Sequence, residues 1–261
     1  MDDFKAQVWD YYRHGARSMP WRDNPSFYYV LVSEMMLQQT QVQRVIPKFN
    51  DFIERFPTLE SLALAPLSAV IEQWVGLGYN RRAKYLHEAS KRVAAVGQPT
   101  TLVGMVALPG VGKNTAAAIM NYVYNAPTPF IETNIRTVYI NHFFNTESSV
   151  SDTQIMVYVM DTLDVDHPRE WFWALMDYGA YLKSQGRGSL SVAKQYKKQG
   201  ALKGSVRQMR GWIVKELSMG DIPAAELNAK FIGDNRYVTA LEGLKRDGLI
   251  DQTGTTVHLT K

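Results

Sequence analysis

The segment Leu108–Val138 reads LPGVGKNTAAAIMNYVYNAPTPFIETNIRTV and contains the pattern that decides the fold. Two glycines, Gly110 and Gly112, bracket a valine directly before an alanine-rich stretch with high helix propensity. Glycine permits a tight turn, and free N–H groups at a helix start bind phosphate oxygens. The pattern predicts a helix-hairpin-helix element of the kind that contacts a DNA backbone, although such helix starts often only turn the chain. Glu132 follows twenty residues after Gly112.

Composition places the chain among ordinary globular proteins. Its 261 residues are 46% hydrophobic and 21% charged, which suits one large domain or two to three small ones. The formal net charge of +4 is only a weak indication of a polyanionic partner. Cysteine is absent, which excludes disulfides, a cysteine nucleophile, a thiolate zinc site and a cysteine-ligated iron–sulfur cluster.

Neither a signal peptide nor a membrane span is expected. The first residues contain no apolar segment of signal-peptide type, and no run of 18 apolar residues occurs in the sequence. We therefore expect a cytoplasmic protein, which for a DNA-binding protein means the nucleoid.

Most of the chain reads as helices separated by Pro and Gly. Pro47 is expected to divide residues 28–56 into two helices, and residues 80–97 predict an amphipathic helix with a basic outer side. Nine Lys or Arg and no Asp or Glu occur between Lys183 and Lys215, which indicates either a solvated basic face or a phosphate-binding tract. The last residues predict three helices and a β-hairpin, typical of a winged-helix module, with a helical cap on the main domain as the alternative.

Several segments over residues 4–183 together resemble the helix-hairpin-helix (HhH-GPD) DNA glycosylase superfamily and, within it, the MutY adenine glycosylases. They are MPWR (Met19–Arg22), SEMMLQQTQVQRVIPKF (Ser33–Phe49), RFPTLESLALAP (Arg55–Pro66), WVGLGYNRRAKYLHEA (Trp74–Ala89), ALPGVGKNTAAAI (Ala107–Ile119) and ALMDYGA (Ala174–Ala180). SEMMLQQTQ points to the MutY branch in particular.

The resemblance implies an all-α fold of two helical subdomains with a cleft between them. Residues 1–21 and 131–183 would form one subdomain, and residues 22–130, with the hairpin at 107–120, the other. A basic linker over 184–204 would lead to a winged-helix-like α/β module over 205–261.

The resemblance also implies a reaction, the hydrolysis of the N-glycosidic bond of a base flipped out of duplex DNA. A mispaired adenine opposite 8-oxoguanine or guanine is the expected substrate. The alternatives are thymine or uracil opposite guanine, another damaged base, or a catalytically silent DNA-binding protein.

Two carboxyl groups would share the chemistry. Glu34 matches the family's proton donor, and its apolar and amide neighbours favour a semi-apolar pocket that keeps the acid protonated; the alternative is an exposed helix residue. Glu132 stands where the family has an Asp that stabilises the oxocarbenium ion. Four interpretations remain open: the same role with shifted geometry, activation of a water, a weakened or repurposed site, and only a helix-start residue that favours the dipole.

Other site residues also follow from the resemblance. Asn114 stands where strand-cutting members carry a Schiff-base Lys, so a monofunctional enzyme is expected; the neighbouring Lys113 would face phosphate. Gln38 and Tyr79 would wedge into the base stack, unless Tyr79 is a core aromatic, while Gln39 and Thr40 border the base pocket. The remaining expectation is a monovalent cation held by three hairpin carbonyl groups, those of Val106, Leu108 and Val111.

Two departures from the MutY pattern complete the expectations. The four cysteines that usually follow MDLGA are missing, so no [4Fe–4S] cluster is expected and no cofactor is required. Four lysines of the basic tract would contact phosphates in its place, with Tyr196 interleaved: Lys194, Lys197, Lys198 and Lys203. The last sixty residues are too few and too helical for the NUDIX-like domain of typical members. The expected partner is double-stranded DNA bearing a mispair or lesion, and the expected state is a monomer.

Overall fold

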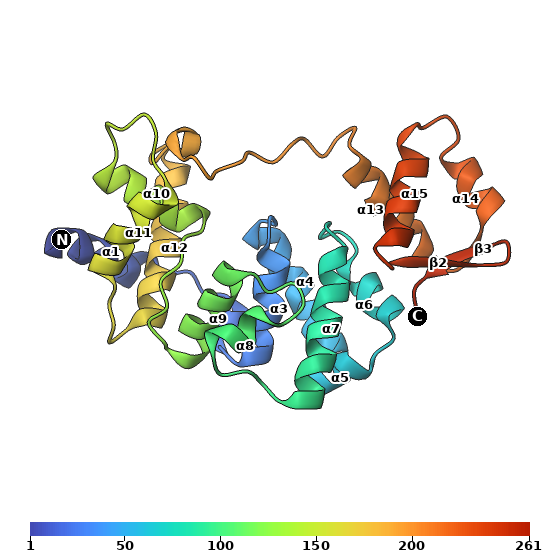
Figure 1. The fold of residues 1–261 in the computed structure, drawn as a ribbon, viewed down its shortest axis with the longest axis horizontal. Helices are drawn as coiled ribbons and strands as arrows, with labels where there is room; N and C mark the ends of the chain where they lie inside the picture. The colour runs from blue at the N-terminus through green and yellow to red at the C-terminus, as the bar shows by residue number, and fades with distance from the viewer. The chain divides into compact units, whose positions relative to one another are not determined.

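The computed structural model describes all 261 residues, and helices dominate it (Figure 1). The chain divides into two compact units, each assembled from separate stretches of sequence. The first unit comprises residues 1–30, 100–107 and 111–198, and the second comprises residues 31–99, 108–110 and 199–261. Among the helices, none combines the length and the apolar character that a membrane span requires.

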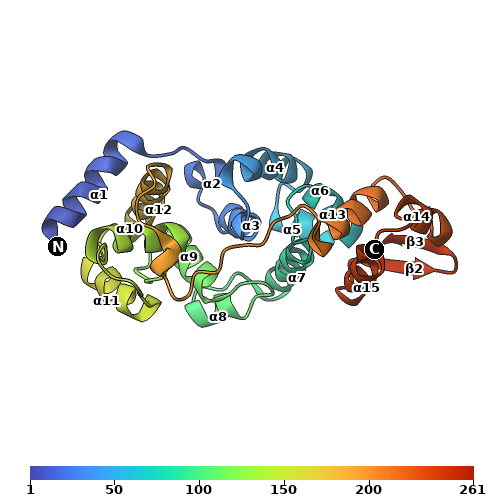
Figure 2. The ribbon, with the colours of Figure 1, turned by 90° about the horizontal axis from the view of Figure 1, so that it is seen from above.

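The first unit is organised around the long helix α12. Its elements are α1 (Asp2–Gly15), α2 (Pro20–Asp23), the start of α3 (Phe27–Leu37), α8 (Leu102–Val106), α9 (Lys113–Tyr124), α10 (Thr133–Phe143), α11 (Asp152–Thr162), α12 (Pro168–Ser184) and the 3₁₀ turn η1 (Leu190–Val192). Helices α1, α9 and α10 all pack on α12, and Figure 2 shows α1 and α10 near it. Trp171, Phe172 and Leu175 of α12 are fully buried in this core.

The second unit combines a helical bundle with a small α/β module. Its elements are the rest of α3, α4 (Val42–Arg55), α5 (Leu59–Leu64), α6 (Leu67–Trp74), α7 (Arg81–Val96), α13 (Val206–Leu217), β1 (Ile222–Pro223), α14 (Ala224–Lys230), α15 (Arg236–Arg246), β2 (Ile250–Thr253) and β3 (Thr256–Leu259). The antiparallel sheet has the order β1-β3-β2. Helix α7 packs on α5 and α6, and α13 and β3 contact α6 (Figure 1).

The break between α3 and α4 lies before Pro47, so the expectation that Pro47 divides this segment is wrong. Pro47 lies inside α4. Its fixed φ is compatible with a helix, and the packing of α4 compensates for the backbone hydrogen bond that proline cannot donate. The chain turns instead at Gln39, whose φ of 58° places it in the left-handed region. This reversal separates a buried apolar helix from an amphipathic one.

Other sequence predictions are confirmed. The chain is mostly helical, as expected. Three helices and a hairpin form the C-terminal module, to which the short β1 adds a third strand.

The compact units differ from the expected subdomains. Helix α9 falls in the first unit because its apolar face packs on α12, and the C-terminal module falls in the second. The segment expected as a linker is partly packed: the Lys194 N–H donates to the Val150 carbonyl at 2.9 Å, and Ala193 forms a parallel bridge with Val150.

Candidate functional site

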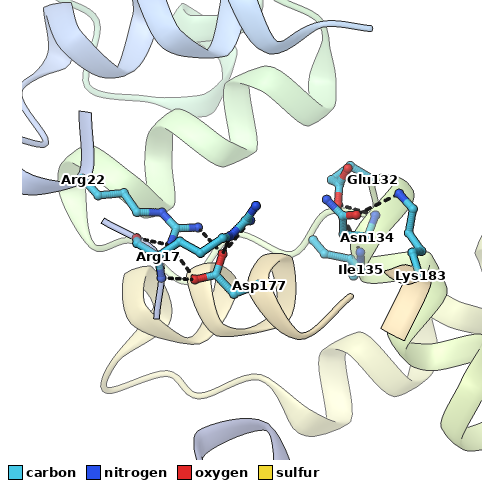
Figure 3. Close-up of polar contacts among 7 residues, drawn as sticks. All are labelled: Arg17, Arg22, Glu132, Asn134, Ile135, Asp177 and Lys183. Atoms are coloured by element: carbon cyan, nitrogen blue, oxygen red, sulfur yellow. Dashed lines mark hydrogen bonds and ion pairs between the residues drawn. The ribbon is translucent and has the colours of Figure 1, made fainter. Parts of the chain in front are cut away.

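Glu132 is the N-cap residue of α10 in the first unit. Its Oε1 accepts hydrogen bonds from the backbone N–H groups of Asn134, at 2.5 Å, and Ile135, at 3.1 Å (Figure 3). These bonds satisfy N–H groups that the first turn of a helix leaves without partners, and the positive end of the helix dipole favours the anion. The carboxylate is therefore held by main-chain atoms.

Burial raises the pKa of Glu132 above its usual value of 4.5, and the hydrogen bonds from Ile135 and Asn134 oppose this rise. The positive charge of Lys183 also favours the ionised carboxylate. Lys183 Nζ donates to Asn134 Oδ1 at 2.9 Å, as Figure 3 shows, so a cation lies beside the cap without forming an ion pair with it. Burial therefore favours the neutral form of Glu132, whereas the two N–H groups and Lys183 favour its ionised form.

Gly179 allows α12 to approach the start of α10. A Cβ atom at this position would lie 2.3 Å from the carbonyl oxygen of Asn134. Such a distance is far inside van der Waals contact, and the obstacle is main chain rather than a flexible side chain. Glycine is therefore required for the two helices to meet beside Glu132.

Asn114 connects the first turn of α9 to the residue before Glu132. Its Nδ2 donates to the carbonyl of Ile131 at 2.6 Å. The side chain therefore fixes the chain that leads into the cap, which is a structural role in addition to the one expected from the family pattern.

Asp177 of α12 is a buried carboxylate that sequence reasoning did not single out. It accepts from Arg17 Nε at 2.7 Å and from the two terminal nitrogens of Arg22 at 2.8 and 2.9 Å, as Figure 3 shows. The backbone N–H of Arg17 donates to it as well, at 3.0 Å. The sequence feature that could have identified it is a lone Asp in the apolar run WFWALMDYGAYL, because a buried charge requires a partner. This group ties the segment before α2 to α12.

Glu34 lies on α3 in the second unit and is partly exposed, between the fully buried residues Ser33 and Met35. The C-terminal end of this helix is held by Arg82, whose guanidinium donates to the carbonyls of Met35 and Met36, each at 2.8 Å. Arg82 thereby fixes the helix that carries the candidate acid.

Arg82 also binds the two loops that border α3 and α7. It donates to the carbonyls of Gln38 at 2.7 Å and Gly78 at 2.8 Å, and to Thr40 Oγ1 at 3.2 Å. Burial lowers its pKa to about 10, so it remains charged at neutral pH. The expectation of a basic outer side for this helix is wrong for Arg82, because α3 and the loop before α7 offer a set of carbonyls that only tertiary structure assembles.

Replacing Arg82 by Met is expected to lower the free energy of unfolding by about 3–5 kcal/mol, because several buried carbonyls lose their donor. Urea unfolding followed by far-UV circular dichroism measures this. Lys91→Met, at an exposed position of α7, is the control and should change stability by less than about 0.5 kcal/mol. Equal stability of the two variants would show that the carbonyls find other partners.

The structure brings Gln39 and Tyr79 together and turns Gln38 elsewhere. Gln39 and Tyr79 both have positive φ, 58° and 48°, and both are bridged by Gln199 of the C-terminal arm: its Nε2 donates to Gln39 Oε1 at 3.2 Å and to the Tyr79 hydroxyl. Gln38 Nε2 donates to the carbonyl of Gly110 at 3.3 Å. The two-residue wedge expected from sequence stays a prediction, and geometry favours Gln39 over Gln38 as the neighbour of Tyr79.

The hairpin glycine Gly110 is required by its surroundings. Its φ is +74°, and a Cβ atom would lie 2.6 Å from Met35 Cε and 2.7 Å from Tyr85 Cβ. Gly112 is the N-cap of α9 and provides no side-chain cap, and Lys113 is exposed at the first helical position. Both features suit phosphate binding.

No group of three or more His, Cys, Asp and Glu side chains is arranged to hold a metal ion. The expected monovalent cation would use the backbone carbonyls of Val106, Leu108 and Val111 instead, and it stays a prediction. A cysteine-ligated cluster does not fit a chain without cysteine.

The four lysines of the basic tract that were expected to contact phosphates are exposed to solvent. The exposed residues are Lys194, Lys197, Lys198 and Lys203, with Tyr196 between the first two, 38% exposed. Their role in binding phosphates stays a prediction.

Comparison with known proteins identifies the family to which this chain belongs. Residues 32–159 match the HhH-GPD superfamily base excision DNA repair proteins. An adenine DNA glycosylase of Mycolicibacterium smegmatis is 32% identical over 95% of this chain and 92% of its own length. One from Mycobacterium tuberculosis is 30% identical over 97% and 91%. One from Buchnera aphidicola is 31% identical over 69% of this chain but only 52% of its own length.

Solved structures share the fold. A thermostable thymine-DNA glycosylase superposes with a TM-score of 0.61 at 22% identity, over 69% of this chain and 85% of its own. An endonuclease III bound non-covalently to DNA gives a TM-score of 0.55 at 16% identity, over 69% and 83%. These likenesses support the arrangement of helices.

Proposed function

We infer the reaction from the premise that this chain belongs to the HhH-GPD superfamily of base excision DNA repair proteins, among the adenine DNA glycosylases, and is a DNA N-glycosylase. We propose that its substrate is a mispaired adenine opposite 8-oxoguanine or guanine in duplex DNA. The relatives that carry the name adenine DNA glycosylase support this substrate. The adenine would be extruded from the helix before the bond to its sugar breaks.

The two carboxyl groups divide the work of bond cleavage. Glu34, in its acid form, would donate a proton to the leaving adenine, because a neutral base leaves more easily than an anion. The deoxyribose becomes an oxocarbenium-like cation, and water attacks it to complete the hydrolysis. Glu132, in its ionised form, would stabilise that cation.

The observation that carries this proposal is the way Glu132 is held. Two backbone N–H groups bind one oxygen of its carboxylate, so the charge is positioned before substrate arrives. A preorganised charge costs no rearrangement when the cation forms. The second carboxylate oxygen takes no bond from α10, which suits a role toward a ligand.

We also propose that the chemistry stops at base removal. Asn114, rather than Lys, occupies the position of the Schiff-base amine in strand-cutting relatives, and its side chain is bound to the Ile131 carbonyl. Borohydride should therefore trap no covalent complex at this position, and strand cleavage should require added alkali.

A panel of duplexes tests the proposed substrate. Each duplex carries adenine, thymine, uracil, hypoxanthine or 8-oxoguanine opposite each normal base or 8-oxoguanine, and abasic sites are revealed with alkali. Cleavage at adenine opposite 8-oxoguanine or guanine is the expected result. Removal of thymine or uracil opposite guanine would reassign the substrate, and binding without any product would indicate a silent DNA-binding protein.

The exposed lysines yield a separate prediction about DNA affinity. Changing the four residues Lys194, Lys197, Lys198 and Lys203 to Ser is expected to weaken binding to any duplex. If each contacts one phosphate, the slope of log K against log salt falls in magnitude by about 3–4. Fluorescence anisotropy between 50 and 200 mM salt, the range over which phosphate contacts change affinity by about 10³- to 10⁵-fold, measures the slope. An unchanged slope would mean that this tract is only a solvated face.

A further inference from the structure

The hydroxyl of Tyr79 is held by two side chains from the C-terminal part of the chain. Gln199 Nε2 and the guanidinium of Arg207 both donate to it, and Gln199 also donates to Gln39. These residues all belong to the second unit. Segments separated by more than a hundred residues therefore form one polar group, which we call the wedge cluster: Gln39, Tyr79, Gln199 and Arg207.

The aromatic ring of Tyr79 contacts two cations. The guanidinium of Arg207 lies 5.1 Å from the ring centroid, and that of Arg82 lies 5.6 Å from it. Both distances are within the range of cation–π attraction. Arg82 is buried and bound mainly by backbone carbonyls, whereas Arg207 is partly exposed at the start of α13.

Arg207 retains hydrogen-bonding capacity. A guanidinium has five N–H donors in a planar fork. Arg207 donates one bond to Tyr79 and one, at 3.1 Å, to the carbonyl of Gly200. Donors therefore remain for a ligand beside the ring.

The module that carries Arg207 is fixed to the bundle. Asp247, with a side chain 7% exposed, accepts from Arg81 of α7 and Arg210 of α13, each at 2.5 Å. Lys84 Nζ donates to the Asp247 carbonyl at 3.1 Å. Because Arg81 is two residues from Tyr79 and Arg210 is three from Arg207, this ion pair sets the position of both.

We propose that Arg207 reads the base left opposite the extruded nucleotide, and that it accepts a guanine there. The inference rests on the proposed function, in which Tyr79 enters the base stack. Arginine forms a bidentate pair with the O6 and N7 edge of guanine, and neither pyrimidine offers that pair of acceptors. The guanidinium of Arg207 lies against the ring of Tyr79, so insertion of this ring into the base stack would bring the guanidinium to the guanine edge. Gln39 and Gln199 supply further donors and acceptors beside it.

Binding and excision are measured separately to test the proposal. Duplexes carry a tetrahydrofuran abasic analogue opposite guanine, 8-oxoguanine, cytosine or thymine, and dissociation constants are measured by anisotropy at one salt concentration. Wild-type protein is expected to bind the guanine duplex about ten- to a hundredfold more tightly than the cytosine duplex. Adenine excision opposite the same four bases is measured in parallel.

Variants at position 207 test whether Arg207 causes the preference for guanine. Arg207→Lys, which keeps the charge but lacks the planar fork, and Arg207→Ala are both expected to reduce the guanine-to-cytosine ratio to about one. Arg246→Ala, which removes an exposed charge from α15 of the same module, should keep the ratio even if it lowers all affinities. Thermal unfolding of each variant shows that it is folded.

The outcomes separate the inference from the proposed function. A wild-type ratio near one, or a wild-type ratio retained by folded Arg207→Lys and Arg207→Ala variants, overturns the role of Arg207. Loss of the ratio in both Arg207 variants supports it. Absence of adenine excision on every duplex overturns the proposed function, while the binding ratios still decide what Arg207 does.

Discussion

Replacing Glu34 by Gln is expected to slow the single-turnover removal of adenine by about 10²- to 10⁴-fold, while binding to DNA is unchanged. Gln has nearly the same shape and can hydrogen-bond, but it has no proton to transfer to a leaving base. The helix around position 34 should keep its fold, because Arg82 continues to hold its C-terminal carbonyls. The loss therefore reports the chemical step.

Glu72→Gln is the matched control for this change. Glu72 is exposed on α6 of the same unit, so the variant has the same change in charge away from the site. It should retain the wild-type rate. If Glu34→Gln also retained it, the proton would have to come from another group, and the assignment of Glu34 would be lost.

Replacing Glu132 by Gln is expected to lower the same rate by about 10²- to 10³-fold, as does removal of one group that stabilises transition-state charge. A neutral amide cannot balance the positive charge of the sugar. Glu132→Asp is a second informative variant, because Asp also caps helices well but is shorter by one methylene. Rate measurements at saturating enzyme compare the three proteins.

The Asp variant distinguishes the explanations for a Glu at this position. A rate well below wild type would mean that the longer side chain compensates for the position of this backbone. A rate above wild type would mean that Glu marks a weakened site. In both cases the fold should persist, since the capping bonds to Asn134 and Ile135 remain available.

The pH dependence of the rate follows from the same residue. Burial raises the pKa of Glu132 above 4.5, and its proposed role requires the ionised form. The rate is therefore expected to fall as pH decreases through that raised pKa, at a higher pH than for an exposed Glu. Glu132→Gln should lack this acid limb in its residual activity.

The raised pKa also has a consequence for stability. The folded state binds this proton more tightly than the unfolded state, so the contribution of Glu132 to stability decreases as pH rises from 4.5 through the folded pKa. At neutral pH the ionised, buried carboxylate disfavours folding. The melting temperature of Glu132→Gln is therefore expected to be no lower than that of the wild type. This result would exclude unfolding as the cause of its lost activity.

Local patterns predicted a large part of the fold. The turn with Gly110 and Gly112 and the C-terminal β-hairpin could be predicted because each depends on residues within a few positions of each other. Resemblance supplied the superfamily because several long motifs occurred in order. The break at Gln39 was missed, since a positive φ at a residue other than glycine has no local signature.

The sequence was enough to propose the two carboxyl groups of the candidate site, but not to predict the residues that hold them in place. Glu34 and Glu132 occupy recognisable motifs, whereas their supporting residues come from distant parts of the chain. Arg82 looked like one more surface cation, and Arg207 like part of a basic tract. Only packing determines whether a charged side chain is buried on carbonyls or lies in water.

The close approach at Gly179 has a consequence for how this enzyme can diverge. The carboxylate at position 132 is aligned by main chain against main chain, so even a single methyl group at 179 would displace α10 and its cap. Changes of side chains away from this contact leave the main-chain geometry of the carboxylate intact, whereas any residue larger than glycine at 179 moves the carboxylate together with its helix.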